Sequence, residues 1–294
     1  MKISIIIRTY NEETYLDDVL RGVAEQRLSR DGLIEVVIVD SGSEDGTLEI
    51  AKKHKCKVVH ISQDEFTFGA SLNVGCASAG GDVCVFLSGH CIPEGDKWLD
   101  HLVRPIVEQG VSYVYGRQIG GAVSKFSECR IFAKYFPGQS VIPQHGFFCN
   151  NANAALKRDV WESNRFDETL TGLEDMELAK RLRLNGMSIA YVSEAAVCHI
   201  HDESWSKVRN RYEREAYALR RIMPEVHISL LDFFRYFLSA VGLDIRALSV
   251  QGFSVYALYE IVMYRFMQYW GGYVGNKEHR MLSKEMKEKY FYPK

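Results

Sequence analysis

Two runs of β-branched residues near the N-terminus, each followed by polar residues, constrain the fold most. Residues 3–7 read Ile-Ser-Ile-Ile-Ile and residues 36–39 read Val-Val-Ile-Val. Short apolar runs of this kind favour buried strands of a parallel sheet. Thr9, Asn11 and Glu12 follow the first run, and Asp40 and Ser41 follow the second. Open α/β sheets bind ligands at the carboxyl ends of their strands, so we expect a binding site at this edge.

The same alternation of apolar runs and helical stretches continues along the chain and predicts an α/β fold. We expect a mostly parallel, Rossmann-like sheet with helices on both faces. Strands are predicted at 3–7, 35–40, 57–61, 83–87, 111–117, 148–156, 188–191 and 196–199. Helices are predicted at 14–26, 46–54, 69–79, 97–109, 174–184 and 205–222, with a short one from residue 158 and an irregular loop over 119–146.

Charge and cysteine usage exclude several classes of protein. The net charge of −2 gives no electrostatic footprint for nucleic acid, so no nucleic-acid partner is expected. The 7 cysteines form no C-x-x-C pair, which favours reduced thiols in a cytoplasmic protein over disulfides or a zinc site. The first strand begins at residue 2 without a basic segment or cleavage site, so no signal peptide is predicted.

The last part of the chain differs in character, and we divide the chain into residues 1–222 and a helical extension, 223–294. Residues 230–243 and 253–270 are predicted helices, apolar and aromatic. Charged residues such as Asp232 and Arg265 interrupt both, so neither is expected to span a membrane. Two interpretations stay open: a helical pair packed on the first domain or in a homodimer, and an amphipathic surface on the inner face of the cell membrane.

An acidic pair opens the helix predicted at 174–184. Residues 171–178 read Thr-Gly-Leu-Glu-Asp-Met-Glu-Leu. Acidic residues favour a helix N-terminus by about 0.3–1 kcal/mol each, which alone would explain Glu174 and Asp175. With the two polar strand ends, however, this pair resembles the inverting glycosyltransferases of family 2, which have the GT-A fold. The resemblance covers roughly residues 2–220 and is strongest to the rhamnosyltransferase-type branch that builds bacterial surface polysaccharides.

That resemblance implies a nucleotide-sugar donor, a saccharide or lipid-linked acceptor, and a role for each matching residue. Asp175, beside Glu174, matches the base that takes the proton of the acceptor hydroxyl. Asp40 matches the residue that contacts the base or ribose of the donor. The other residues that the resemblance places at the donor are Thr9, Asn11, Glu12, Ser41, Asn73, Ser88, Gly89, Arg117, Asn151 and Asn153.

One motif of the family is missing. Where the family has Asp-x-Asp, whose carboxylates hold a divalent cation on the diphosphate, this chain has Ser88-Gly89-His90. Either His90 is a metal ligand, or it hydrogen-bonds the phosphate directly, or catalysis has been lost. His199 and His201 alternate along a predicted strand and so share a face. They are candidates to join His90 on Mn²⁺ or Mg²⁺, although an imidazole suits softer ions better than Mg²⁺.

Other functions are weaker. A sugar nucleotidyltransferase needs a glycine-rich phosphate loop after the first strand, and residues 8–11 contain no glycine. A dinucleotide-dependent oxidoreductase needs G-x-G-x-x-G after a strand, which is also missing. The remaining alternative is a degenerate family member that binds a nucleotide sugar or a partner without turnover. No motif encodes the base, the sugar, the acceptor, the linkage or the oligomeric state.

Overall fold

The computed structural model describes residues 1–251, 254–278 and 284–292. The chain forms two compact units. The first comprises Met1–Gly121, Ala133–Thr169 and Glu174–Ile200, and the second comprises Ala122–Phe132, Leu170–Leu173 and His201–Lys294. This grouping by contact places helix α8 (Trp205–Ile222) in the second unit, whereas the sequence analysis placed it in the catalytic domain. The division at 222/223 stays a prediction about functional domains.

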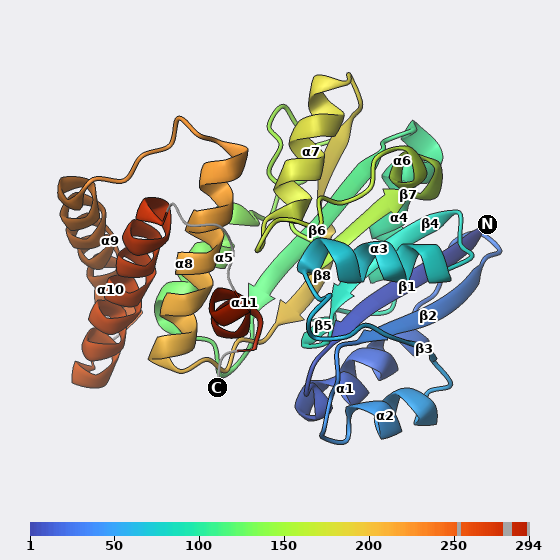
Figure 1. The fold of residues 1–294 in the computed structure, drawn as a ribbon, viewed down its shortest axis with the longest axis horizontal. Coiled ribbons are helices and arrows are strands. Elements are labelled where there is room, and N and C mark those ends of the chain that lie inside the picture. Colours follow the sequence, from blue (N-terminus) through green and yellow to red (C-terminus); the bar gives the residue numbers. More distant parts are fainter. Residues whose placement is uncertain (252–253, 279–283, 293–294) are drawn as a thin grey trace. The chain divides into compact units, whose positions relative to one another are not determined.

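The first unit is built on a sheet of 8 strands in the order β3-β2-β1-β4-β7-β6-β8-β5 (Figure 1). Parallel pairs join β1 to β2, β1 to β4, β2 to β3 and β6 to β8. Strand β7 runs antiparallel to both β4 and β6, and β5 is antiparallel to β8, so the sheet is mixed. The strands are β1 (Lys2–Thr9), β2 (Leu33–Asp40), β3 (Lys57–His60), β4 (Val83–Ser88), β5 (Cys91–Pro93), β6 (Tyr113–Gly120), β7 (Asn153–Lys157) and β8 (Ile189–His199).

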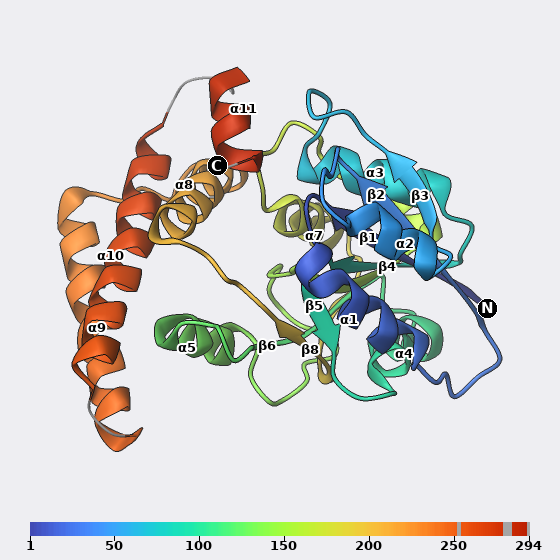
Figure 2. The same cartoon turned by 90° about the horizontal axis from the view of Figure 1, so that it is seen from below.

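Helices cover both faces of this sheet, as the alternating pattern predicted. Leu16 and Val19 of α1 and Leu99 and Leu102 of α4 pack with alternate residues of β1 and β4 in one core cluster. Helix α3 lies on the opposite face (Figure 2). Its Gly75 approaches β1 so closely that a Cβ at this position would lie 2.4 Å from the Ile6 side chain. The helices of this unit are α1 (Glu13–Ala24), α2 (Thr47–Lys53), α3 (Phe68–Ser78), α4 (Trp98–Gln109), α6 (Arg158–Ser163) and α7 (Glu174–Leu184).

Three local predictions were wrong. The stretch 119–146, predicted to be irregular, contains helix α5 (Phe126–Tyr135), whose buried face includes the polar residues Ser127 and Glu128 and so gives no apolar period. The strand predicted at 148–156 begins only at Asn153. The two short strands predicted at 188–191 and 196–199 are one strand, β8, because a bulge lets residues 193–195 pass between successive pairs with β6.

The second unit consists mainly of helices: α8, α9 (Leu230–Gln251), α10 (Val255–Lys277) and α11 (Lys284–Phe291). Two glycines one turn apart let α10 approach α8, since a Cβ on Gly275 would lie 2.0 Å from the carbonyl oxygen of Glu213. Buried Asp244 and Arg265 join α9 to α10 through an ion pair of 2.7 Å. Among the residues that the structure describes, no helix has the length and apolar character needed to cross a bilayer.

Candidate active site

The ends of β1 and β2 form one fixed platform around Asp40, which is 1% exposed. Thr9 and Asp40 are register partners, and the Thr9 hydroxyl donates to Asp40 Oδ1 at 3.0 Å. The Ser43 hydroxyl donates to the same oxygen at 2.6 Å, while the backbone N–H groups of Gly42 and Ser43 both donate to Oδ2 at 3.0 Å. A carboxylate has about four lone-pair sites, so these four bonds use its capacity. Asp40 therefore fixes the conformation of the turn that follows β2.

The turn after β1 is tied to the same platform. Asn11 adopts a left-handed conformation with φ 55°, its Oδ1 accepts from the Glu44 N–H at 2.9 Å, and its own N–H donates to Ser43 Oγ at 2.9 Å. Buried Ser41 donates its hydroxyl to the carbonyl oxygen of Thr9 at 3.3 Å. The fold thus brings the predicted donor residues Thr9, Asn11, Asp40 and Ser41 together at this edge. The turns after β1 and β2 are held against each other by these bonds.

His90, two residues beyond the end of β4, is anchored by Glu12. His90 Nδ1 lies 3.0 Å from Glu12 Oε1. An ionised carboxylate only accepts hydrogen bonds, so Nδ1 carries the proton, and in the neutral ring Nε2 carries the lone pair. Gly89 allows this arrangement, because a Cβ at that position would lie 3.0 Å from Glu12 Cγ. Histidines that bind a metal are typically held by a carboxylate in this way.

A second imidazole, that of buried His199 at the end of β8, stacks on His90 with ring centroids 5.1 Å apart and planes 22° apart. A chain of amides fixes its tautomer. The Ala152 N–H donates to Asn150 Oδ1, which also accepts from Gln118 Nε2, both at 3.0 Å. Gln118 Oε1 is therefore the acceptor for His199 Nδ1 at 2.7 Å. Like His90, neutral His199 carries its lone pair on Nε2.

Gln118 and Asn150 received no separate role in the sequence analysis. Gln118 follows Arg117 and Asn150 precedes Asn151 in the sequence, but the bonds of both amides depend on how β6, β8 and the turn before β7 meet. The only signal was an amide next to a candidate site residue in the sequence.

In the second unit, His201 Nδ1 lies 2.7 Å from Glu128 Oε1, and Arg211 donates to the same oxygen at 2.7 Å. A share of His201 in a metal site with His90 and His199 stays a prediction.

The acidic pair at the start of α7 is buried. Asp175 accepts from the Asn151 N–H at 2.8 Å and from the Met176 N–H at 2.7 Å. Burial, and next the nearby charge of Glu174, raise the pKa of Asp175 to about 8, although both backbone N–H groups and Arg8 oppose the shift. A carboxyl group with this pKa exchanges a proton near neutral pH, as a general base must.

Asn151 holds both acids in place. Its side-chain nitrogen lies 3.4 Å from Glu174 Oε1, and its Oδ1 accepts from the Tyr113 hydroxyl at 2.5 Å. Arg8, at the end of β1, approaches the same Glu174 oxygen at 3.5 Å. This places the acidic pair beside the strand end that carries Thr9, so the predicted base and the predicted donor platform belong to the same edge of the sheet.

Two other predicted donor residues use their polar atoms within the protein. Buried Asn73 donates to the Phe166 carbonyl at 3.0 Å and accepts from Trp161 Nε1 at 3.0 Å. Buried Asn153 accepts from Trp98 Nε1 at 2.9 Å and donates to the carbonyl oxygens of Arg117 and Ala195. Both side chains hold neighbouring segments in place, and their geometry favours a structural role.

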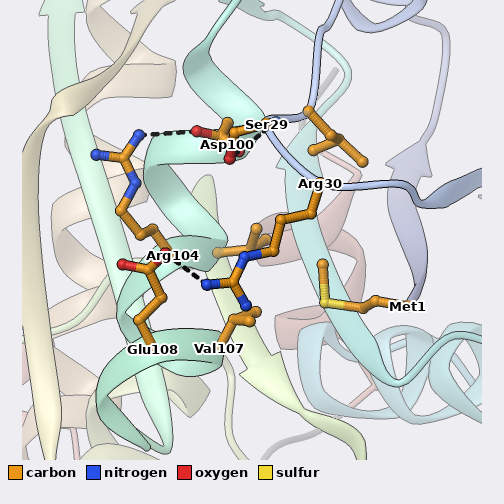
Figure 3. A pocket seen from close by; sticks show the side chains of 9 residues that line it. Met1, Ser29, Arg30, Asp100, Arg104, Val107 and Glu108 are labelled. Carbon is orange, nitrogen blue, oxygen red and sulfur yellow. Dashed lines mark hydrogen bonds and ion pairs between the residues drawn. The ribbon is translucent and has the colours of Figure 1, made fainter.

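A small hollow lies elsewhere in the first unit, between residues 28–30 and α4 (Figure 3). Its polar groups are paired with one another: Ser29 and Arg104 both bond Asp100, and Arg30 bonds Glu108. None of the predicted site residues lines this hollow. It is therefore a structural junction rather than a candidate for the active site.

Comparison with known sequences gives one family. The family model described as glycosyl transferase family 2 matches residues 4–164. An O-antigen chain rhamnosyltransferase of Salmonella typhimurium is 28% identical over 226 residues, which cover 72% of this chain and 70% of that protein. An O-antigen chain rhamnosyltransferase of Salmonella anatum is 31% identical over 191 residues, covering 60% of each chain.

Comparison with solved structures concerns the fold. A mannosyltransferase from Pyrobaculum calidifontis, in complex with GDP-mannose and Mn²⁺, superposes with a TM-score of 0.62, covering 94% of this chain and 88% of that one. The sequence identity is 17%, so the similarity shows the GT-A fold. The α/β architecture with a helical C-terminal part, predicted from the sequence, is thereby confirmed.

Proposed function

The chain belongs to glycosyl transferase family 2, and we propose that this glycosyltransferase moves a sugar, with inversion, from a nucleotide-sugar donor to a saccharide or lipid-linked acceptor. The two O-antigen rhamnosyltransferases among its relatives favour a role in the synthesis of a bacterial surface polysaccharide. The observation that carries the proposal is the buried acidic pair at the start of α7, whose Asp175 has a raised pKa and lies at the edge that ends β1.

Asp175 is the proposed general base. As the acceptor hydroxyl oxygen forms its bond to the anomeric carbon, the hydroxyl proton moves to the Asp175 carboxylate. The bond from the anomeric carbon to the diphosphate breaks on the opposite face, and its electron pair leaves with the diphosphate. Asn151 orients both acids through its backbone N–H and its side chain. The platform around Asp40 holds the nucleoside, through backbone and exposed groups that Asp40 keeps in position.

The stacked imidazoles of His90 and His199 are the proposed support for the departing diphosphate. Both have Nδ1 engaged by an oxygen and carry the lone pair of the neutral ring on Nε2. This donor set fits Mn²⁺ or another transition ion better than Mg²⁺, which prefers oxygen ligands. Such an ion would neutralise the charge that develops on the leaving group. The alternative is a direct hydrogen bond from a protonated His90 to phosphate.

A degenerate binding protein is the second candidate, and the loss of both carboxylates of Asp-x-Asp supports it. The buried Asp175 argues against this candidate. Its position raises its pKa and so disfavours the charged carboxylate, and such shifted groups are typical of catalytic sites rather than of sites that only bind. Incubation of UDP-, GDP-, dTDP- and CMP-sugars with the protein, with and without Mn²⁺, separates the two. Release of nucleotide or transfer of sugar supports the enzyme, and binding without either supports the degenerate member.

For the helical extension we propose a peripheral contact with an anionic membrane surface at the cytoplasmic face. Leu231, Phe234 and Leu238 lie on one face of α9 and are 81%, 50% and 64% exposed. Arg235 and Arg246 of the same helix are exposed, whereas Asp244 is buried. Exposed apolar and cationic residues on one helix suit an interface with acidic lipids. Sedimentation with phosphatidylglycerol vesicles, but not with phosphatidylcholine vesicles, is expected; a dimer that binds neither would favour the homodimer.

A further inference from the structure

Arg117 on β6 has a guanidinium nitrogen that the fold leaves without a partner. Its Nε is buried and makes no hydrogen bond. Two other described arginines also have a buried Nε without a hydrogen bond, but their guanidinium groups have partners. Arg209 forms an ion pair with Glu213 at 3.8 Å, and Arg214 donates to the Tyr290 carbonyl at 3.0 Å. No such bond or ion pair satisfies the Arg117 guanidinium within the described part of the chain. Buried donors without acceptors are rare in native proteins, and Arg117 as a whole is only half-buried, so its guanidinium is accessible to a bound acceptor.

The strand geometry separates Arg117 from the proposed diphosphate support. Neighbouring residues of a strand point to opposite faces of the sheet. Gln118 bonds His199, which stacks on His90. Arg117 points the other way, toward Gly138 and Tyr191. A Cβ on Gly138 would lie 4.0 Å from Arg117 Nη1. Burial raises the pKa of Tyr191, and the charge of Arg117 partly opposes that shift. The family resemblance suggests that Arg117 contacts the donor. The direction of its side chain, away from His90 and His199, instead favours a ligand group other than the donor diphosphate.

The face to which Arg117 points is the face of the proposed base. Tyr113, Tyr115 and Arg117 alternate along β6 and therefore share this face. Tyr113 bonds Asn151, whose backbone N–H bonds Asp175. The proposed base and the unpartnered guanidinium are thus linked to the same side of the sheet, where the acceptor hydroxyl must arrive.

A row of aromatic rings extends along this side. The Tyr115 ring lies 5.0 Å from that of Tyr191 and 5.5 Å from that of Phe148. Tyr135 stacks on Phe148 at 5.5 Å with planes 20° apart, and is itself 46% exposed. An exposed, rigidly backed ring is a suitable contact for the apolar face of a sugar. Arg117 and Tyr135 therefore lie at two ends of one cluster of packed rings, in which Tyr115 and Tyr191 are buried.

We propose that Arg117 binds an oxyanion of the acceptor, a phosphate or a carboxylate, while Tyr135 contacts an acceptor sugar ring. A guanidinium presents its donors as a planar fork that matches both kinds of oxyanion. This inference rests on the proposed function, since it assigns the charge of that reaction's acceptor. It makes Arg117 a specificity-determining residue for anionic acceptors.

The test compares the parent with Arg117→Gln and with the control Arg27→Gln, whose exposed side chain pairs with Asp96 at the surface of the same unit. Acceptors are methyl glycosides of one hexose in three forms: neutral, carrying a phosphodiester, and oxidised to the uronic acid. Arg117→Gln is expected to raise KM for the matching anionic acceptor about 10-fold or more, because hydrogen bonds to charged groups have effects of this size. Its effect on transfer to the neutral acceptor should be much smaller, so that the preference of the parent for the anionic acceptor is lost.

The form that responds identifies the oxyanion as phosphate or carboxylate. Equal losses on all three acceptors, or no loss on any, would overturn the inference, whereas a parent that turns over no donor at all would instead refute the proposed function. A binding measurement then still tests Arg117. With the donor site filled by whichever of UDP, GDP or dTDP raises the melting temperature most, inorganic phosphate and acetate should raise it further in the parent and in Arg27→Gln, but not in Arg117→Gln. A further rise of the same size in all three proteins would overturn the assignment.

Discussion

Replacement of Asp175 by Asn tests the proposed base most directly. Asn keeps the size of the side chain and can accept from the Asn151 N–H, but it cannot take a proton. General-base catalysis typically contributes about 10²–10⁴-fold to a rate, so transfer should fall by about 10²-fold or more while the nucleotide still binds. The matched control is Glu177→Gln on the same helix, since Glu177 pairs with Arg181 at 2.8 Å and belongs to no predicted site.

The pKa of Asp175 gives this prediction a second, quantitative arm. Burial raises that pKa to about 8, and only the ionised form accepts a proton. The parent's kcat/KM should therefore rise about tenfold per pH unit between pH 6 and 7 and level off above pH 8, and the Asn variant should lose this dependence. A flat parent profile between pH 6 and 9, or near-normal turnover by the Asn variant, would refute the assignment of Asp175.

The same shift affects stability, and its sign is opposite to that of a salt-bridged carboxylate. The folded state holds the Asp175 proton up to pH 8, whereas the unfolded chain loses it near the ordinary value of 3.8. The folded state thus binds more protons between these values, and its stability falls as pH rises from about 4 to 8. The amide side chain of the Asn variant does not ionise, so chemical denaturation should show a smaller loss of unfolding free energy over this window in Asp175→Asn than in the parent.

Three further changes test the donor side. His90→Ala should lower transfer and abolish the effect of a chelator on what remains, and full activity with an unaltered chelator response would remove His90 from the site. Gln118→Leu takes away the acceptor that fixes His199, and should weaken Mn²⁺ binding about 10–100-fold, as losses of such supporting residues do; calorimetric titration with Mn²⁺ measures this, and unchanged affinity would speak against the stacked pair as ligands. Asp40→Ala should lower both the melting temperature and the nucleotide affinity, because four donors lose their acceptor, whereas unchanged nucleotide affinity would place the nucleoside elsewhere.

The sequence was a good guide wherever a local pattern decides the structure. Helix 174–184 has the predicted bounds, and β1 and β2 end at the polar residues that the apolar runs implied. It was a poor guide where long-range pairing decides. Nothing local reveals that β7 runs antiparallel between β4 and β6, or that α5 buries Ser127 and Glu128. The same holds for the candidate site, where the family resemblance suggested Asp40, Asn73 and Asn153 for the donor, but only the fold reveals which protein groups their polar atoms bond.

If Ser88-Gly89-His90 faces the leaving group, as we propose, the exchange of Asp-x-Asp for this sequence changes the charge there. Two carboxylates would cancel the charge of a divalent ion, whereas two neutral imidazoles leave all of it facing the diphosphate. That arrangement binds an ion more weakly but opposes the developing negative charge more strongly. Glu12 restores one negative charge on the far side of the His90 ring, 3.0 Å from Nδ1. There the carboxylate orients the ring and makes it a better electron donor. We therefore propose that the Glu12–His90 pair takes over both tasks of the missing carboxylates, and on this proposal Glu12→Gln should weaken Mn²⁺ binding without removing a ligand.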